Sequence, residues 1–251
     1  MGTTEGLEDT ILSVSKASKI NEDIKINHFL VANNFIKISD VDNKTKKYSV
    51  NCKIIDINPI CSRSVARNKG LDAVSCQNIN SYVMFLDVGD ELRLDSIKMI
   101  RKQKNSLSDN LIFICKSSIN FNRKSKPINI PLYPLWMRYI VNPFLIGGII
   151  VSAKLAKKEY FYDGKKEDWI YWISLLNLKP QLVYLDSVNF IYNIFNVSDH
   201  YDKKWRSFIE LRTVLVEKLK WNTFLSYPIS LLHIVLASCR WIYLRILNQF
   251  Y

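Results

Sequence analysis

The chain has 251 residues, of which 48% are hydrophobic and 23% charged, and its formal net charge at pH 7 is +12. This length accommodates one domain with a modest appendage, and the apolar fraction suffices for a buried core. The basic residues are dispersed and accompany no nucleic-acid motif. We therefore expect nucleotide ligands or an anionic membrane surface as partners, and no nucleic acid.

The cysteines and the hydropathy of the chain indicate the cellular compartment of the protein. Five cysteines, with no C-x-x-C pair and no histidine at ligand spacing, indicate a reducing environment. The N-terminus does not read as a signal peptide, and no apolar run reaches the roughly 18 uninterrupted residues of a transmembrane helix. These features predict a cytoplasmic protein that does not span a membrane.

Helix and strand patterns alternate along the first half of the chain. In chain order we expect an amphipathic helix at 5–19, a strand at 28–32, a polar loop at 40–52, a strand at 53–57, a helix from about Ser64, a strand at 82–86, a helix at 94–104 and a strand at 111–116. Such alternation favours a mostly parallel α/β sheet flanked by helices.

The second half is less regular. Four prolines between 118 and 143 predict an excursion that leaves the sheet. The run from Phe144 then returns as a strand, in which Gly147-Gly148 either lets a ligand approach the backbone or marks a bulge. We expect a helix from Glu167, with Trp169 and Trp172 in the core rather than against a sugar, and two further strands at 181–185 and 190–195.

The stretch Phe85-Leu-Asp-Val-Gly-Asp-Glu-Leu follows a buried strand with two aspartates, Asp87 and Asp90. Ligands of open α/β sheets collect at the carboxyl ends of strands. Acidic side chains there, beside a glycine that lets the backbone bend, suit a hard divalent cation carrying phosphates. The alternative is that both aspartates only cap a turn.

A second acidic motif, Glu167-Asp168-Trp169, opens a helix. We expect the terminal N–H groups of the helix to lower the pKa of a carboxylate at this position and to fix its direction. The alternative is that the two acids only cap the helix.

Taken together, Ala66-Arg-Asn-Lys-Gly-Leu, Leu86-Asp-Val-Gly-Asp and Glu167-Asp-Trp resemble glycosyltransferase family 2, the inverting enzymes of GT-A fold that use nucleotide sugars. The resemblance covers roughly 5–195 and is nearest to the surface-polysaccharide branch. It implies a Rossmann-like GT-A domain at 1–200, with a basic amphipathic helical tail at 201–251. The strand that usually precedes the first helix of this family is missing, and we expect a start further upstream rather than a truncation.

The resemblance also implies roles for individual residues. The expected catalytic residues are Asp168, as base, and Glu167; the expected nucleotide-sugar ligands are Arg67, Asn68, Asp87 and Asn33; and the expected ligands of a divalent cation, Mg or Mn, are Asp90, Asp87 and His200. Gly89 stands where many relatives have a second Asp, which weakens the expectation of a metal.

The tail from 201 carries apolar and basic residues at helical spacing, which suits a helix in the bilayer interface or a helix docked on the core. We therefore expect an inverting glycosyltransferase, peripheral on the inner face of the cell membrane, that transfers a sugar to a lipid-linked glycan in O-antigen or capsule synthesis. The alternative is a non-catalytic, decayed transferase that binds sugar nucleotides or membranes.

Overall fold

The computed structural model describes residues 4–20, 25–32, 38–48, 51–56, 61–75, 81–103, 108–121, 128–130, 135–140, 142, 144–164, 166–194, 216, 224, 226–232, 235–236 and 238–239. In chain order its elements are α1 (Thr4–Ile20), β1 (His28–Ala32), α2 (Ile38–Lys47), β2 (Cys52–Asp56), α3 (Arg63–Ala73), β3 (Tyr82–Met84), β4 (Glu91–Leu92), α4 (Leu94–Lys102), β5 (Leu111–Phe121), β6 (Ile128–Ile130), η2 (Leu135–Tyr139), η3 (Ile146–Gly148), β7 (Ile149–Ser152), α5 (Ala153–Ala156), α6 (Glu167–Asn177) and β8 (Gln181–Ile194).

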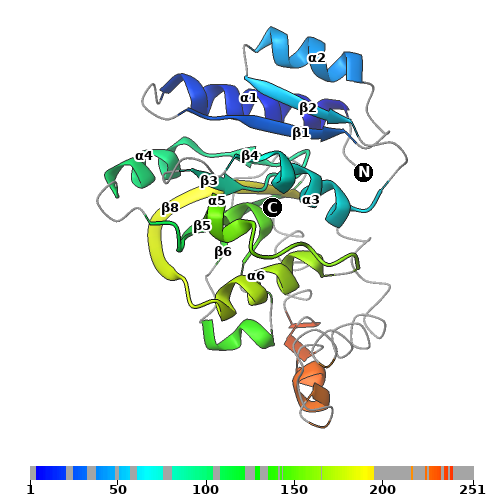
Figure 1. The fold of residues 1–251 in the computed structure, drawn as a ribbon, viewed down its shortest axis with the longest axis vertical. Coiled ribbons are helices and arrows are strands. Elements are labelled where there is room, and N and C mark those ends of the chain that lie inside the picture. Colours follow the sequence, from blue (N-terminus) through cyan, green and yellow to red (C-terminus); the bar gives the residue numbers. More distant parts are fainter. Residues whose placement is uncertain are drawn as a thin grey trace.

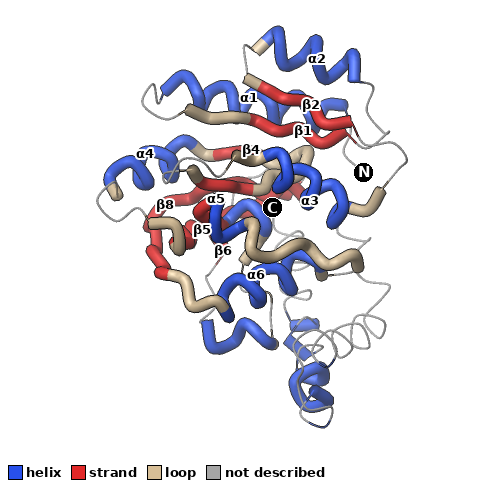
Figure 2. Tube along the Cα trace, viewed as in Figure 1, coloured by secondary structure: helices blue, strands red, loops and turns tan. Residues whose placement is uncertain are grey.

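The described strands form two sheets. Strands β1 and β2 pair in parallel, with His28 opposite Cys52. The larger sheet has the order β3-β7-β5-β8-β4, and β6 pairs with β5. Helices α1 and α2 lie with the small sheet at one end of the molecule, and α6 lies beyond the large sheet (Figure 1). Figure 2 shows the helices α3, α4 and α6 around the strands of the large sheet.

The expected mixed α/β class is confirmed, but the large sheet is not mostly parallel. Only the β5–β8 pair in it is parallel, whereas β3–β7, β5–β7, β5–β6 and β4–β8 are antiparallel. All four residues of β7 are buried. An apolar run of this kind shows that a strand is central, but it carries no information about the strand's direction.

Most expected elements are present, and the differences have local causes. The expected loop at 40–52 is largely the helix α2, because Val41 is buried and the helix makes contacts with Glu8 of α1. Glu8 accepts hydrogen bonds from Tyr48 and from the ammonium groups of Lys47 and Lys44, the latter two at 2.9 and 3.3 Å. Tertiary contacts thus override a polar local sequence.

Two strands are longer than expected. Strand β5 continues to Phe121, into the stretch expected to be irregular, and β8 joins the two expected strands at 181–185 and 190–195. The β5–β8 register shifts next to Lys116, which lets both strands continue past a β-bulge. The gap between the two expected strands is therefore an irregularity inside one strand.

The main core lies between the large sheet and the helices α3, α5 and α6. It includes Leu71, Phe85, Ile112, Phe161 and Trp172. Trp169 and Trp172 are 2% and 1% exposed, which confirms their expected place in the core. A smaller cluster joins α1 to the small sheet. Within the described residues, no helix is long and apolar enough to cross a bilayer.

The Gly147-Gly148 pair is explained by close packing. A Cβ atom on Gly147 would lie 2.6 Å from the ring of Phe190, and one on Gly148 would lie 2.6 Å from Ser117 Oγ. Neither distance is tolerable for a side chain. The pair therefore allows η3 to lie directly against β5 and β8, which accounts for the glycines without a ligand.

Candidate active site

The turn after β3 holds the first acidic motif. Asp90 N donates to Asp87 O at 3.1 Å, and Gly89 adopts a φ of 105°, a conformation that favours glycine. Helix α1 fixes the turn through Thr10, whose hydroxyl donates to Asp90 O at 2.7 Å and accepts from Gly89 N at 3.0 Å. The expected turn at Asp87–Asp90 is thus present, and a buried side chain that the sequence did not indicate holds its geometry.

Asp90 is 3% exposed and lies against β8. Its Oδ1 accepts from Asn193 N at 3.1 Å, while its Oδ2 is buried with no hydrogen-bond partner among the described residues. Burial, and then the charge of Asp87, raises the pKa of Asp90 to about 8. Asp90 is therefore mostly protonated at neutral pH unless a cation replaces its proton.

Asn193 of β8 completes this buried group. Its amide nitrogen donates to Gly89 O at 2.6 Å and to Glu91 Oε1 at 3.2 Å. These two bonds fix the orientation of the amide, and its Oδ1, like Asp90 Oδ2, is buried without a partner among the described residues. Two buried oxygens without hydrogen-bond partners are unusual, since such atoms normally have a partner.

Arg67 of α3 connects the first acidic motif to the second. Its Nη2 lies 2.9 and 3.0 Å from the two carboxylate oxygens of Asp87, and its Nη1 donates to Glu167 Oε1 at 3.1 Å. The Arg67 side chain is 10% exposed and that of Glu167 is 5% exposed. Arg67 thus bridges residues 20 and 100 positions away. Both ends of its guanidinium are engaged by carboxylates, so it would have to exchange partners to hold a diphosphate.

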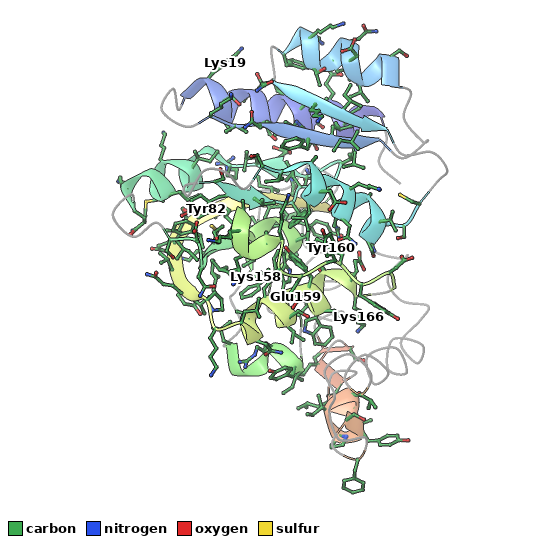
Figure 3. All side chains as sticks on the ribbon, viewed as in Figure 1. Lys19, Tyr82, Lys158, Glu159, Tyr160 and Lys166 are labelled. Carbon is green, nitrogen blue, oxygen red and sulfur yellow. The ribbon has the colours of Figure 1, made fainter. Side chains whose placement is uncertain are left out.

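Asn68 is placed differently from the expectation of a donor ligand. Its amide nitrogen donates to Phe161 O at 2.9 Å, and its Oδ1 accepts from Phe161 N at 2.8 Å. The backbone of Phe161 therefore engages both the nitrogen and the oxygen of the Asn68 amide. This pair ties α3 to the segment that leads into α6, where Figure 3 labels Tyr160 and Lys166.

Asp168 lies in the first turn of α6, after Lys166, which has a left-handed φ of 60°. Its Oδ2 accepts a hydrogen bond from Asn142 Nδ2 at 2.8 Å. Burial, and then the charge of Glu167, raises the pKa of Asp168, although Arg67, the N–H of Trp169 and Asn142 oppose the shift. The N–H of Trp169 at the helix start lowers this pKa, as expected, but the net shift is upward because loss of solvent outweighs the terminal N–H groups.

The two acidic motifs lie in one electrostatic neighbourhood. Burial lowers the pKa of Arg67, but the charges of Asp87, Glu167 and Asp168 raise it more. Burial, and then the charges of Asp90 and Asp87, raises the pKa of Tyr192, and Asp168 adds to this shift. Carboxylates from the β3 turn and from the start of α6 thus shift the pKa values of both Arg67 and Tyr192. The two motifs are therefore connected through Arg67, which contacts a carboxylate of each.

The remaining expected ligands of the donor and the cation are Asn33, His200, Asp87 and Asp90. Asn33 and His200 lie outside the described residues. Within the described part of the chain, no group of three or more His, Cys, Asp or Glu side chains is arranged to hold a metal ion. Both oxygens of Asp87 accept hydrogen bonds from Arg67, so a cation at Asp87 would share them with the guanidinium. Asp90 Oδ2 and Asn193 Oδ1 fit the role of metal ligands, because they are oxygen acceptors without donors.

Sequence reasoning missed Asn142, Asn193, Tyr192 and Thr10. Each is an ordinary polar residue that no local motif distinguishes, and each contributes through contacts across the fold. A scan against models of protein families returns no match for the chain, and a search of curated proteins returns none. The resemblance to glycosyltransferase family 2 therefore depends on the three motifs and on their arrangement.

Proposed function

We propose that the chain is an inverting glycosyltransferase of GT-A type, which transfers a sugar from a nucleotide-sugar donor to a lipid-linked glycan in surface-polysaccharide synthesis at the cytoplasmic face of the membrane. The observation that carries the proposal is the carboxylate of Asp168, oriented by Asn142 and joined to the β3 turn through Arg67 and Glu167. A helix-start acid and a strand-end acid thus lie in one group, as a single displacement requires.

The chemistry assigned to Asp168 is general-base catalysis. The acceptor hydroxyl oxygen bonds to the anomeric carbon while the bond from that carbon to the diphosphate oxygen breaks, so the configuration inverts. The hydroxyl proton passes to Asp168, and the nucleoside diphosphate leaves with the electrons of the broken bond. The raised pKa of Asp168 suits this role, because a base with a pKa nearer the working pH is a better proton acceptor.

Asp90 and Asn193 would hold a divalent cation, Mg or Mn, through their two buried acceptor oxygens. A cation bound there would offset the negative charge of the leaving diphosphate. The described residues contribute two oxygens to it, fewer than such ions prefer, so the donor diphosphate and water would supply the others. Arg67 holds Asp87 and Glu167 in place through its hydrogen bonds to their carboxylates. Thr10 of α1 fixes the turn at Asp87–Asp90.

The test is release of nucleoside diphosphate from a panel of UDP-, GDP- and TDP-sugars by wild type and by Asp168→Asn. We expect the substitution to lower the rate by about a hundredfold or more, because it removes the base while keeping the side-chain shape. Asp186→Asn is the matched control, since Asp186 is 83% exposed and pairs with Lys116 on the surface. It should leave the rate unchanged.

Two results would contradict the proposal in different ways. Full activity of Asp168→Asn would exclude this residue as the base. Binding of a nucleotide sugar by wild type without any turnover, across the donor panel and with Mg or Mn present, would favour the alternative of a decayed transferase that only binds.

A further inference from the structure

The C-terminal helical segment, meaning the described helical residues 224, 226–232, 235–236 and 238–239, has one side docked on the protein. Ile229 packs against the cluster of Trp169, Ile173 and Tyr139. Ser226 and Ser230 are fully buried. The segment is therefore anchored on α6, and Trp169, one of its anchors, directly follows Asp168.

The opposite side of this segment is apolar and exposed. Phe224 is 81% exposed, Leu231 59% and Val235 51%, and Tyr227 and Leu232 are also exposed. At about 100° per residue, these five positions fall on one side of a helix, and 226, 229 and 230 fall on the other. Five of the eight exposed large hydrophobic residues in the described part of the chain lie on this apolar face. Such a concentration marks an interaction surface, whereas single exposed apolar residues do not.

The amino-acid composition of the C-terminal stretch indicates which partner suits the apolar face. Residues 201–251 contain eight lysines and arginines and three acids, so the formal net charge of this stretch is 8 − 3 = +5. No Asp or Glu follows Glu217. An apolar face in a stretch of sequence with this net positive charge is complementary to anionic lipid headgroups above acyl chains.

We infer that the apolar face inserts into the interface of a bilayer that contains anionic lipid, with the helical segment lying in the membrane plane. Because Ile229 packs against the cluster of Trp169 and Ile173, the same packing would hold the start of α6 next to the bilayer. Asp168 would then lie where a lipid-linked hydroxyl is presented. This last step depends on the proposed function, whereas insertion of the apolar face does not.

The experiment is co-sedimentation of the full chain with vesicles, without donor or acceptor. The vesicles are phosphatidylcholine alone, or phosphatidylcholine and phosphatidylglycerol mixed about two to one. The test variant is Phe224→Ser/Leu231→Ser/Val235→Ser. Its control is Leu178→Ser/Tyr184→Ser, which removes apolar side chains that are 39% and 56% exposed elsewhere. Circular dichroism checks that both variants keep the wild-type fold.

We expect wild type and control to bind the mixed vesicles, more weakly as salt rises, and the triple variant to bind about a hundredfold more weakly. Absence of wild-type binding, or equal binding by triple variant and control, overturns the inference. A dimer in gel filtration that the triple variant converts to monomer, without vesicle binding, would also overturn it and assign the apolar face to a second copy. Because no turnover is measured, these outcomes are independent of the proposed transfer reaction.

Discussion

Asn142 Nδ2 lies 2.8 Å from Asp168 Oδ2 and donates a hydrogen bond to it, while Asn142 Oδ1 accepts from Phe144 N at 3.3 Å. The amide is therefore held at both ends, and it engages one oxygen of the carboxylate. This contact joins residues 26 positions apart and makes Asn142 a positioning residue for the proposed base.

Asn142→Ala should move the acidic limb of the pH–rate profile to higher pH. The hydrogen bond from Asn142 lowers the pKa of Asp168, against the upward effects of burial and of Glu167. Without this bond the pKa of Asp168 rises further, so the carboxylate forms only at higher pH. The measurement is donor turnover as a function of pH. Asn177→Ala serves as control, and a profile that keeps its midpoint in Asn142→Ala would reduce Asn142 to a structural role.

Arg67→Met should destabilise the fold strongly, by about 3–5 kcal/mol, because it leaves the buried Glu167 and the neighbouring Asp87 without their shared partner. Arg63 also contacts Glu167 Oε1, at 3.3 Å, but its side chain is 75% exposed. Arg63→Met should therefore change the free energy of unfolding by less than about 1 kcal/mol. Urea unfolding measures the free energy of unfolding of both variants. Equal losses in the two variants would show that the burial of Arg67 does not determine how much its ion pairs stabilise the fold.

Asp90→Asn should change how stability depends on pH. Because burial raises the folded-state pKa of Asp90 to about 8 from an ordinary value of 3.8, the folded state binds more protons than the unfolded state between these values. The contribution of Asp90 is thus full below the unfolded pKa and is lost as pH rises toward 8. Asparagine resembles the protonated acid and does not titrate. The variant should match wild type near pH 4 and exceed it at pH 8.5, by an upper limit on the order of 5 kcal/mol.

Urea unfolding at several pH values, in the absence of divalent cations, measures this difference. Other groups titrate in both proteins, so the relevant quantity is the gap between variant and wild type at each pH. A gap that stays constant from pH 5 to pH 8.5 would show that Asp90 is ionised throughout.

Manganese should raise the melting temperature of wild type at pH 7.5, because a ligand that binds only the folded state stabilises it. The increase should disappear in Asp90→Asn and shrink in Asn193→Ala, since these residues carry the two buried oxygens without donors. Asp87→Asn should keep most of the increase, because both oxygens of Asp87 face Arg67. Loss of the increase in Asp87→Asn alone would reverse the assignment of the ligands.

The local patterns in the sequence determined most of the elements around the candidate site. The apolar run before Asp87, the helix from about Ser64 and the acids that open α6 are all present, because each depends on periodicity and end signals within about a dozen residues. The same helical spacing predicts a core position for Trp169 and Trp172, and both are buried.

The tertiary structure alone decided strand direction, the helical state of α2 and the partners of Arg67. All four residues of β7 are buried, and a buried strand is apolar whether it runs parallel or antiparallel to its neighbours. Helix α2 is stabilised by Glu8, which lies 36 or more residues away in the sequence. The carboxylates paired with Arg67 lie 20 and 100 residues from it. The energies of such contacts depend on distance and on exclusion of water, and both exist only after the chain has packed.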